Sequence, residues 1–457
     1  MLNISANLGE VGQRRQIWLG VAGVLFIGLI WYFFPHPLTP LVVCALPIAF
    51  LVTAKIPFLM GMLFILFSFF RLHEALPFLM PFKFPFLLAL GTLYALVVNI
   101  ALKRLQLFWD PLYLPFVLLF IHVTIGIGFS TNPAESFAFW KNTYIKIAVM
   151  VFALSWVIRT EKQLVWAARL IALGAFVVAL IALRNKATGI ELVEGTRVTI
   201  GRSIGSMLGD PNDLSLVLLF GAAFAFSLAL GRFLSTSDRW LGFVVYITIV
   251  LAIIATQSRG GLLGIAAVTG VVLSRRIQSK ALLIGLGTVA LLGLFVVAGV
   301  SDRQSGGAHE EGIDESAMGR IYAWKAAFNM AIHNPVTGVG VKNFFNNYFQ
   351  YSEHWDGKNH AVHSTWFGVM AETGVLGFIL FIWMMVALIL ALRRAGAELD
   401  HQKKARPELK CITMALIAGF VGFCVSGTFL TQGYIWPIYI ILALSVSLKR
   451  VVFQNDA

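Results

Sequence analysis

Charged residues are scarce in this sequence. They make up 12% of its 457 residues, whereas soluble globular proteins carry roughly 25%. Hydrophobic residues make up 58% of the chain and its mean hydropathy is +0.82. This composition excludes an ordinary soluble protein, and the apolar runs of about 20 residues indicate a chain that crosses a membrane many times.

Cysteine is also rare, and nucleic-acid-binding motifs are absent. The three cysteines, Cys44, Cys411 and Cys424, all lie inside apolar runs, and their spacing matches neither a disulfide framework nor a metal site. The formal net charge of +13 therefore does not indicate a nucleic-acid partner. We predict no nucleic-acid partner and no metal.

Long apolar runs account for most of the chain. Because the membrane interior offers no water to satisfy backbone groups, each run must form a helix. We predict an all-α polytopic membrane protein with about 12–14 transmembrane helices, built as one helical transmembrane domain over residues 1–457. The runs cover residues 17–34, 38–54, 57–70, 85–102, 112–129, 144–158, 163–183, 212–231, 240–256, 260–274, 281–300, 366–392, 411–430 and 433–448.

The distribution of lysine and arginine predicts the orientation, because short cytoplasmic loops carry an excess of both. With a cytoplasmic N-terminus, the even-numbered turns all carry basic residues, and this bias places both termini inside. These turns contain Lys55, Lys103 and Arg104, Arg159 and Lys162, Arg232 and Arg239, Arg275 to Lys280, the cluster over residues 393–410, and Lys449 and Arg450.

Three segments then face outward: residues 184–211, the turn at Ser258–Gly260, and a polar segment over residues 301–365. The last is a large loop between late transmembrane helices and contains an amphipathic stretch. The outward segments still hold Arg197, Arg202, Arg259 and Arg320. Positive charge on the disfavoured side is simply explained by an anionic ligand, although some loops also tolerate arginine without function.

Arg259 lies in TQSRGG, between two apolar runs with almost no loop to separate them. A charge near the membrane interior is unfavourable and usually marks a functional site. A guanidinium presents a fixed fork of donors that suits phosphate oxygens, and we expect Gly260 and Gly261 to let a ligand approach the backbone. The alternative is an arginine that extends to the lipid headgroups.

Arg320 opens the amphipathic stretch, in which Ile321, Trp324, Phe328 and Ile332 fall on one helical face. We expect that face to rest on the bundle or on the membrane surface. Asn334 and Pro335 should end the helix before a TGVG turn. An anion bound at Arg320 would also benefit from the helix N-terminus; alternatively, Arg320 is a solvated end residue.

His360 and His363 close the outward loop, and we expect His363 to begin the next transmembrane helix. A helix N-terminus disfavours the protonated imidazole, so His363 would stay neutral and able to accept a proton as a general base. A capping role and a two-histidine metal site are the alternatives, and no carboxylate or cysteine pattern supports the metal. Upstream, Asp210 or Asn212 should cap the helix that follows RVTIGRSIGSMLGDPND.

These pieces together resemble the O-antigen ligase and polymerase superfamily of membrane glycosyltransferases (WaaL/Wzy-type), and the chain is most similar to the ligases. The resemblance rests on RSIGSMLGDPND, on SRGG at Ser258, on GRIYAWKAAFNMAIHNPVTGVGVKNF at Gly319 and on HSTWFGVMAETGVLG at His363. It covers about residues 197–378. No one of these strings is specific alone, but their order around a large outward loop is.

The resemblance implies a GT-C-type, metal-independent transferase in the bacterial inner membrane, with its active site facing the periplasm and no cofactor. The donor would be a glycan on undecaprenyl diphosphate, and the acceptor lipid A–core or another glycan. By analogy, Arg259 and Arg320 would bind the diphosphate, with Arg202 or Arg197 assisting. His363 would activate the acceptor hydroxyl, and His360 is a possible acceptor contact. Ser364 stands where an asparagine is common in the family.

Three other activities stay open at this point. A polysaccharide polymerase of the same superfamily and an O-linked oligosaccharyltransferase would use the same donor chemistry. A transporter of lipid-linked glycans would also be polytopic, but it should show internal repeats, and none is evident.

Overall fold

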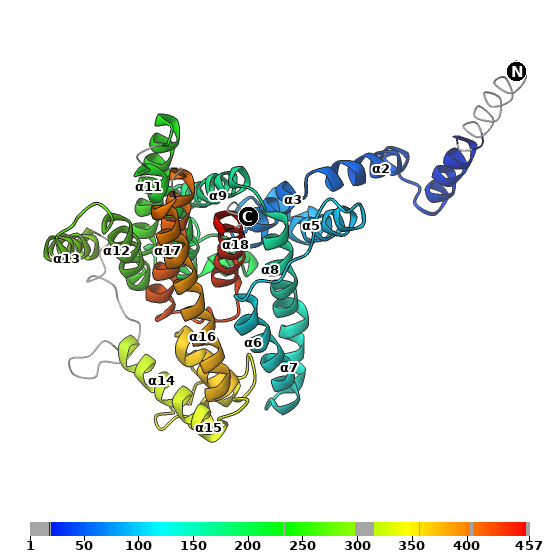
Figure 1. The fold of residues 1–457 in the computed structure, drawn as a ribbon. Coiled ribbons are helices and arrows are strands. Elements are labelled where there is room, and N and C mark those ends of the chain that lie inside the picture. The colour runs from blue at the N-terminus through cyan, green and yellow to red at the C-terminus, as the bar shows by residue number, and fades with distance from the viewer. Residues whose placement is uncertain are drawn as a thin grey trace, which may run out of the picture.

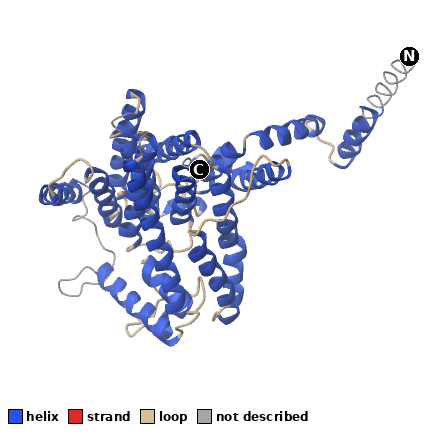
Figure 2. Cartoon of the chain, viewed as in Figure 1, coloured by secondary structure: helices blue, strands red, loops and turns tan. Residues whose placement is uncertain are grey.

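The structure is a computed structural model that describes Trp18 and residues 20–231, 234–297, 315–355, 357–402 and 405–453, with side chains in the polar loop from Met318 onward. Figure 2 shows helix almost throughout. The described strands are β1 (Leu192–Val193) and β2 (Arg197–Val198), an antiparallel pair in which Leu192 lies opposite Val198. The predicted all-α polytopic fold is confirmed.

In the described part of the chain, nine helices are long and apolar enough to span a membrane. A further pair of apolar helices meets at 95°, and three apolar helices are shorter. If all of these cross, the number falls in the predicted range of 12–14. The nine are α5 (Phe84–Ala101), the run α7 (Pro133–Phe139), η3 (Trp140–Tyr144) and α8 (Ile145–Val157), then α9 (Glu161–Thr188), α10 (Pro211–Ala229), α11 (Thr236–Thr256), α13 (Lys280–Val297), α16 (Thr365–His401), α17 (Pro407–Gly427) and α18 (Trp436–Phe453).

The remaining helices complete the arrangement in Figure 1. The bent pair is α2 (Thr39–Lys55) with α3 (Pro57–Ser68), and the three short apolar helices are Gly20–Phe33, α6 (Tyr113–Gly126) with η2 (Ile127–Phe129), and α12 (Arg259–Leu273). The short connecting helices are α4 (Leu72–Ala75), η1 (Pro77–Phe82), η4 (Arg202–Ile204) and η5 (Met207–Gly209), and the polar loop contains α14 (Glu315–His333) and α15 (Phe344–Tyr351).

Helix α10 forms the centre of the bundle. Nearly all of its residues are buried, and it packs against α9, α11, α12 and α17. Small residues allow the close approach, since a Cβ added to Gly221 would overlap the side chain of Ala175. This central position matters for function because the first turn of α10 carries Asp210 and Asn212 to one end of the bundle.

The basic turns predicted to share one side of the membrane are connected to one another. Arg159 Nη1 donates a hydrogen bond to the Arg104 carbonyl at 3.2 Å, and Arg406 forms an ion pair with Glu161 at 2.9 Å. The turns after α12 and α16 are joined by Arg275, whose Nη1 lies 3.5 Å from a carboxylate oxygen of Asp400. These contacts bring four of the predicted basic turns together at one end. Arg232, Lys403 and Lys404 lie outside the described residues.

The segments predicted to face outward meet at the other end. Thr196 of the first segment donates to Gln257, beside the turn at Ser258, at 2.9 Å, and Arg320 of the polar segment lies at one pocket with Ser258 and Arg259. Figure 1 shows α14 and α15 beside the first part of α16 and the ends of α6 and α7. The described parts of the three outward segments therefore lie together, while residues 301–314 of the polar loop lie outside the described residues.

Helix α16 is broken at Gly374, and the polar loop fills the break. Gly374 has φ 70° and ψ −177°, so the carbonyls before it lose their helical partners. Val339 N donates to Ala371 O at 3.0 Å and Gly340 N to Glu372 O at 3.2 Å. His122 Nε2 lies 2.9 Å from Thr373 O. The carbonyls of Ala371, Glu372 and Thr373 thus have new donors, as a buried backbone requires. Two of these donors come from the polar loop, which is thereby fixed to the span.

We expect Gly374→Ala to destabilise the protein markedly. A backbone in this region is strained for any residue with a Cβ, by about 1–3 kcal/mol. The added Cβ would also lie 2.6 Å from Pro335 O. Thermal unfolding in detergent should shift down by several degrees. Gly270→Ala, in an open helical position, is the control and should be neutral. A wild-type melting temperature for Gly374→Ala would contradict this account of the break.

Three local expectations need correction. Helix α14 starts at Glu315, so Arg320 lies in its second turn and not at its N-terminus. Helix α16 starts at Thr365 with Ser364 as its N-cap, so His363 precedes the helix. The apolar face of α14 does not rest on the bundle, since Ile321, Phe328 and Ile332 are 41%, 50% and 54% exposed and Ala323, Ala326, Ala327 and Met330 form the buried face. Of the two expected supports, only the membrane surface is left for it.

Candidate functional site

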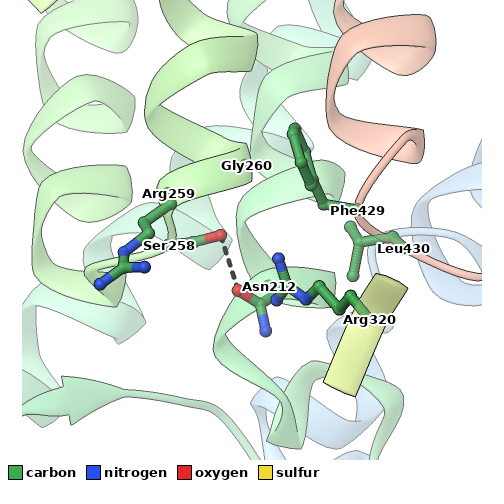
Figure 3. A pocket seen from close by; sticks show the side chains of 7 residues that line it. All are labelled: Asn212, Ser258, Arg259, Gly260, Arg320, Phe429 and Leu430. Atoms are coloured by element: carbon green, nitrogen blue, oxygen red, sulfur yellow. Dashed lines mark hydrogen bonds between the residues drawn. The ribbon is translucent and has the colours of Figure 1, made fainter. Parts of the chain in front are cut away.

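Two of the predicted arginines line one pocket at the outward-facing end. Arg259 comes from the start of α12 and Arg320 from α14, with Asn212 from the first turn of α10 between them (Figure 3). The other lining residues are Ser258, Gly260, Phe429 and Leu430. Residues more than 200 positions apart in the sequence therefore converge where the outward turns meet.

Arg259 is the first residue of α12, and its side chain is exposed. Ser258 caps this helix by accepting a hydrogen bond from Gly261 N at 3.1 Å. Gly261 serves helix packing, since an added Cβ would lie 2.6 Å from Ser215. Gly260 lines the pocket, where an added Cβ would make only an ordinary contact of 3.4 Å with Phe429. The tight packing fixes the turn that presents Arg259 at the pocket.

Arg320 extends across the pocket toward Asn212 (Figure 3). Its guanidinium carbon lies 5.8 Å from the centroid of the Phe429 ring, a cation–π contact. The pocket has a volume of about 20 Å³, room for roughly one water. A phosphate group must therefore bind at its mouth or move the Arg320 side chain off the ring.

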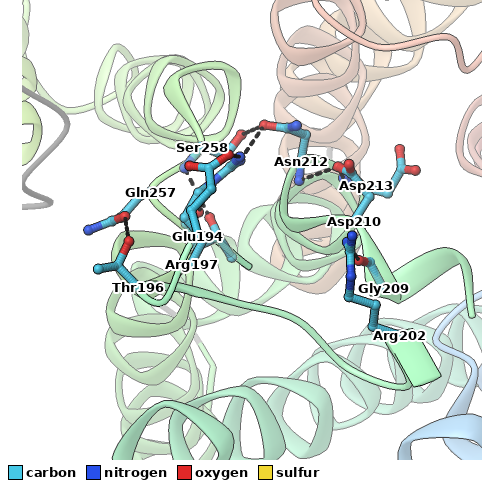
Figure 4. Close-up of polar contacts among 11 residues, drawn as sticks. Glu194, Thr196, Arg197, Arg202, Gly209, Asp210, Asn212, Asp213, Gln257 and Ser258 are labelled. Carbon is cyan, nitrogen blue, oxygen red and sulfur yellow. Dashed lines mark hydrogen bonds and ion pairs between the residues drawn. The ribbon is translucent and has the colours of Figure 1, made fainter. Parts of the chain in front are cut away.

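Arg197 lies behind the pocket and is only 3% exposed. Its Nε donates to Thr256 O at 3.2 Å, its Nη2 donates to Asn212 Oδ1 at 3.2 Å, and its Nη1 is 3.5 Å from a carboxylate oxygen of Glu194 (Figure 4). Its guanidinium therefore joins β2, the end of α11 and the start of α10. It supports the pocket from inside the protein and does not line it.

Arg202 occupies a different position, on the other side of the turn that leads into α10 (Figure 4). It is exposed, and its Nη1 donates to Gly209 O at 3.2 Å. Glu191 accepts a hydrogen bond of 2.6 Å from its backbone nitrogen. Neither Arg202 nor Arg197 lines the pocket with Arg259 and Arg320, and the two upstream arginines differ in position: Arg197 is buried and Arg202 is exposed.

His363 lies immediately before the α16 N-cap, with a backbone φ of 43°, a value uncommon for residues other than glycine. The pKa of His363 is lowered from its ordinary value of 6.5, chiefly by loss of hydration and next by the positive charge of Arg320. His360 acts in the same direction and the carboxylate of Asp210 opposes both. The expected direction is thus found, but burial and Arg320 cause it.

Trp324 holds the segment that carries His363. Its Nε1 donates to Val362 O at 3.1 Å, and its ring stacks on Phe367 with 5.2 Å between centroids. Since Trp324 is one turn beyond Arg320 on α14, this contact ties the predicted base to the predicted anion ligand. His360 is half-buried and places its ring 5.3 Å from that of Tyr348, nearer the centre of the polar loop.

The sequence did not reveal that Asn212 and Phe429 would line the pocket. It offered Asp210 or Asn212 as the helix cap, and the structure selects Asp210, which accepts from Asn212 N at 2.7 Å and Asp213 N at 3.3 Å. The Asn212 side chain is therefore not used as the cap and instead lines the pocket. Among the described residues, no group of three His, Cys, Asp or Glu side chains is placed to hold a metal.

The comparisons with known proteins gave one family. A search of curated proteins found no match. Residues 243–382, a stretch that includes Arg259, Arg320, His360 and His363, match the family model described as O-Antigen ligase. This match confirms, for this part of the chain, the resemblance to the O-antigen ligase and polymerase superfamily stated above.

Proposed function

We propose that this protein is an O-antigen ligase, which transfers a glycan from undecaprenyl diphosphate to lipid A–core at the periplasmic face of the bacterial inner membrane. The observation that carries the proposal is the convergence of Arg259 and Arg320 on one pocket. The positive charge of Arg320 also lowers the pKa of His363. Two guanidinium groups suit a diphosphate, and a neutral imidazole suits a hydroxyl that must lose its proton.

The proposed reaction is a metal-independent displacement at the anomeric carbon. His363 takes the proton of the acceptor hydroxyl while that oxygen forms a bond to the anomeric carbon. The bond between this carbon and the phosphate oxygen breaks, and undecaprenyl diphosphate leaves with the electron pair. Arg259 and Arg320 stabilise the charge that develops on the leaving group. Attack from the face opposite the diphosphate inverts the configuration at this carbon.

The upstream arginines and His360 have secondary roles in this proposal. Arg202, exposed beside Gly209, lies where it could meet a more distal part of the donor, and His360 would contact the acceptor. No cofactor is required, because a diphosphate is already a good leaving group.

The nature of the acceptor is tested in a strain that lacks the protein and makes O-antigen. We expect the strain to accumulate full-length chains on the lipid carrier and to lose them from lipopolysaccharide, with recovery on re-expression of the wild type. Products of a single repeat would indicate the polymerase activity instead. Loss of a glycan from proteins, with normal lipopolysaccharide, would indicate O-linked oligosaccharyl transfer.

The proposed orientation places α14, α15 and residues 184–211 in the periplasm and both termini in the cytoplasm. The support is the lysine and arginine bias together with the sorting of the turns to two ends. A periplasm-active reporter fused at Gly307 should be active, whereas the same reporter at Gln402 should be inactive. Equal activity at both positions would reverse or break the topology, and with it the assignment of the site.

A further inference from the structure

The amide group of Asn212 is held in one orientation by two donors. Arg197 Nη2 lies 3.2 Å and Ser258 Oγ lies 2.8 Å from the same side-chain atom, Oδ1. A guanidinium only donates, so its partner must be the carbonyl oxygen of the amide. Ser258 already accepts from Gly261 N, which leaves its hydroxyl proton for the same oxygen. The amide oxygen of Asn212 therefore faces the protein interior.

The amide nitrogen must then face the opposite way. Asn212 is half-exposed and lines the pocket together with Arg259 and Arg320. Figure 3 shows its nitrogen on the side away from the bond to Ser258. Across the hydrogen bonds of the described residues, Nδ2 has no protein acceptor, whereas Oδ1 has two donors. Two N–H groups are thus presented where an anion would bind.

We propose that Asn212 binds a phosphate oxygen of the donor diphosphate through Nδ2, and that Arg197 and Ser258 are positioning residues that fix its orientation. This inference rests on the proposed function and adds to it. It also explains the buried Arg197, which acts through the amide and does not touch the diphosphate. The Asn212 amide is neutral and lies between the guanidinium groups of Arg259 and Arg320. It can therefore donate to a phosphate oxygen without adding positive charge to the repulsion between the two arginines.

The critical variant is Asn212→Asp. A carboxylate has nearly the same shape and still accepts from Arg197 and Ser258, so the fold should be retained. It turns an acceptor oxygen toward the phosphate in place of a donor. We expect the Kd of undecaprenyl diphosphate, measured on the purified protein in nanodiscs, to rise by about a hundredfold for Asn212→Asp and about tenfold for Asn212→Ala. The melting temperature without ligand should stay near that of the wild type.

Asn132→Asp is the matched control. Asn132 is exposed at the same end of the molecule and caps α7 through Glu135 N, and aspartate caps a helix equally well. The variant makes the same chemical change away from the pocket and should bind the diphosphate like the wild type. If Asn212→Asp binds as well as Asn132→Asp does, Asn212 is not a ligand and the inference is wrong.

A double-mutant cycle separates positioning from general support. Arg197→Lys should weaken diphosphate binding severalfold in the wild type but add little when Asn212 is already alanine. Full additivity of the two effects would overturn the positioning role. The Arg259→Ala protein distinguishes failure of the Asn212 inference from failure of the proposed function. If Arg259→Ala loses diphosphate binding while both Asn212 variants keep it, only the inference about Asn212 fails. A wild-type protein that binds no diphosphate would refute the proposed function itself.

Discussion

Replacing Arg259 or Arg320 with alanine should reduce glycosyl transfer by about 10²–10³-fold, the effect typical of removing one donor that stabilises developing negative charge. Both guanidinium groups line the same pocket, so each substitution removes charge and hydrogen-bond donors from one site. Transfer is measured with membranes that contain matched amounts of each variant. We expect the single variants to be similar and the double variant to be inactive.

Lysine substitutions distinguish charge from geometry. Lysine keeps the charge but loses the planar fork, so Arg259→Lys and Arg320→Lys should restore only part of the activity. Arg275→Ala is the control, since Arg275 is an exposed arginine at the other end of the bundle with a surface ion pair to Asp400, and such pairs contribute little. Near-normal transfer by both Arg259→Ala and Arg259→Lys would exclude the diphosphate role of that residue.

Replacing His363 with alanine should lower transfer by about 10²–10⁴-fold, as expected for loss of a general base. Binding of the lipid-linked donor should persist, because the arginines and Asn212 are unchanged. His360→Ala is the matched control and should have a milder effect, as His360 packs on Tyr348 within the loop. An active His363→Ala protein would contradict the assignment, and an inactive one that no longer binds donor would make His363 a structural residue.

The pH dependence of transfer provides a second check on His363. Burial and the charge of Arg320 hold the pKa of His363 below 6.5, and only the neutral imidazole accepts a proton. Activity should therefore be level near pH 7 and fall as the pH decreases through this lowered pKa. In the Arg320→Ala protein the pKa should move up, so the residual activity should begin to fall at a higher pH than in the wild type.

The fold was largely predictable because membrane helices follow from apolar run length and charge bias alone. The end of α14 was also predictable, since Asn334 and Pro335 form a local stop signal and the helix does end at His333. The start of α14 was not, because Glu315 carries no distinctive pattern, and the error placed Arg320 at a helix terminus.

The candidate site was predictable only in part. Features that depend on neighbouring residues in the sequence could be predicted, whereas contacts between distant segments could not. Arg259, Arg320 and His363 were proposed as site residues from their unusual places on the predicted outward side and from the resemblance. The role of Asn212 depends on Arg197 and Ser258, which reach it from β2 and from the start of α12. The spacing of these residues in the sequence does not predict that Arg197 and Ser258 contact Asn212. The buried position of Arg197 likewise depends on packing and not on its neighbours in the chain.

The polar loop is hydrogen-bonded to the break in α16, and this limits which segment of the protein can be exchanged with that of a relative. Val339 and Gly340 complete the hydrogen bonding of Ala371 and Glu372, so the polar loop and the middle of α16 share one backbone network. A chimera that replaced only the loop would bring residues shaped for a different break. Recombination intended to change substrate preference should therefore move the loop and α16 together, with crossover points before α14 and after α16.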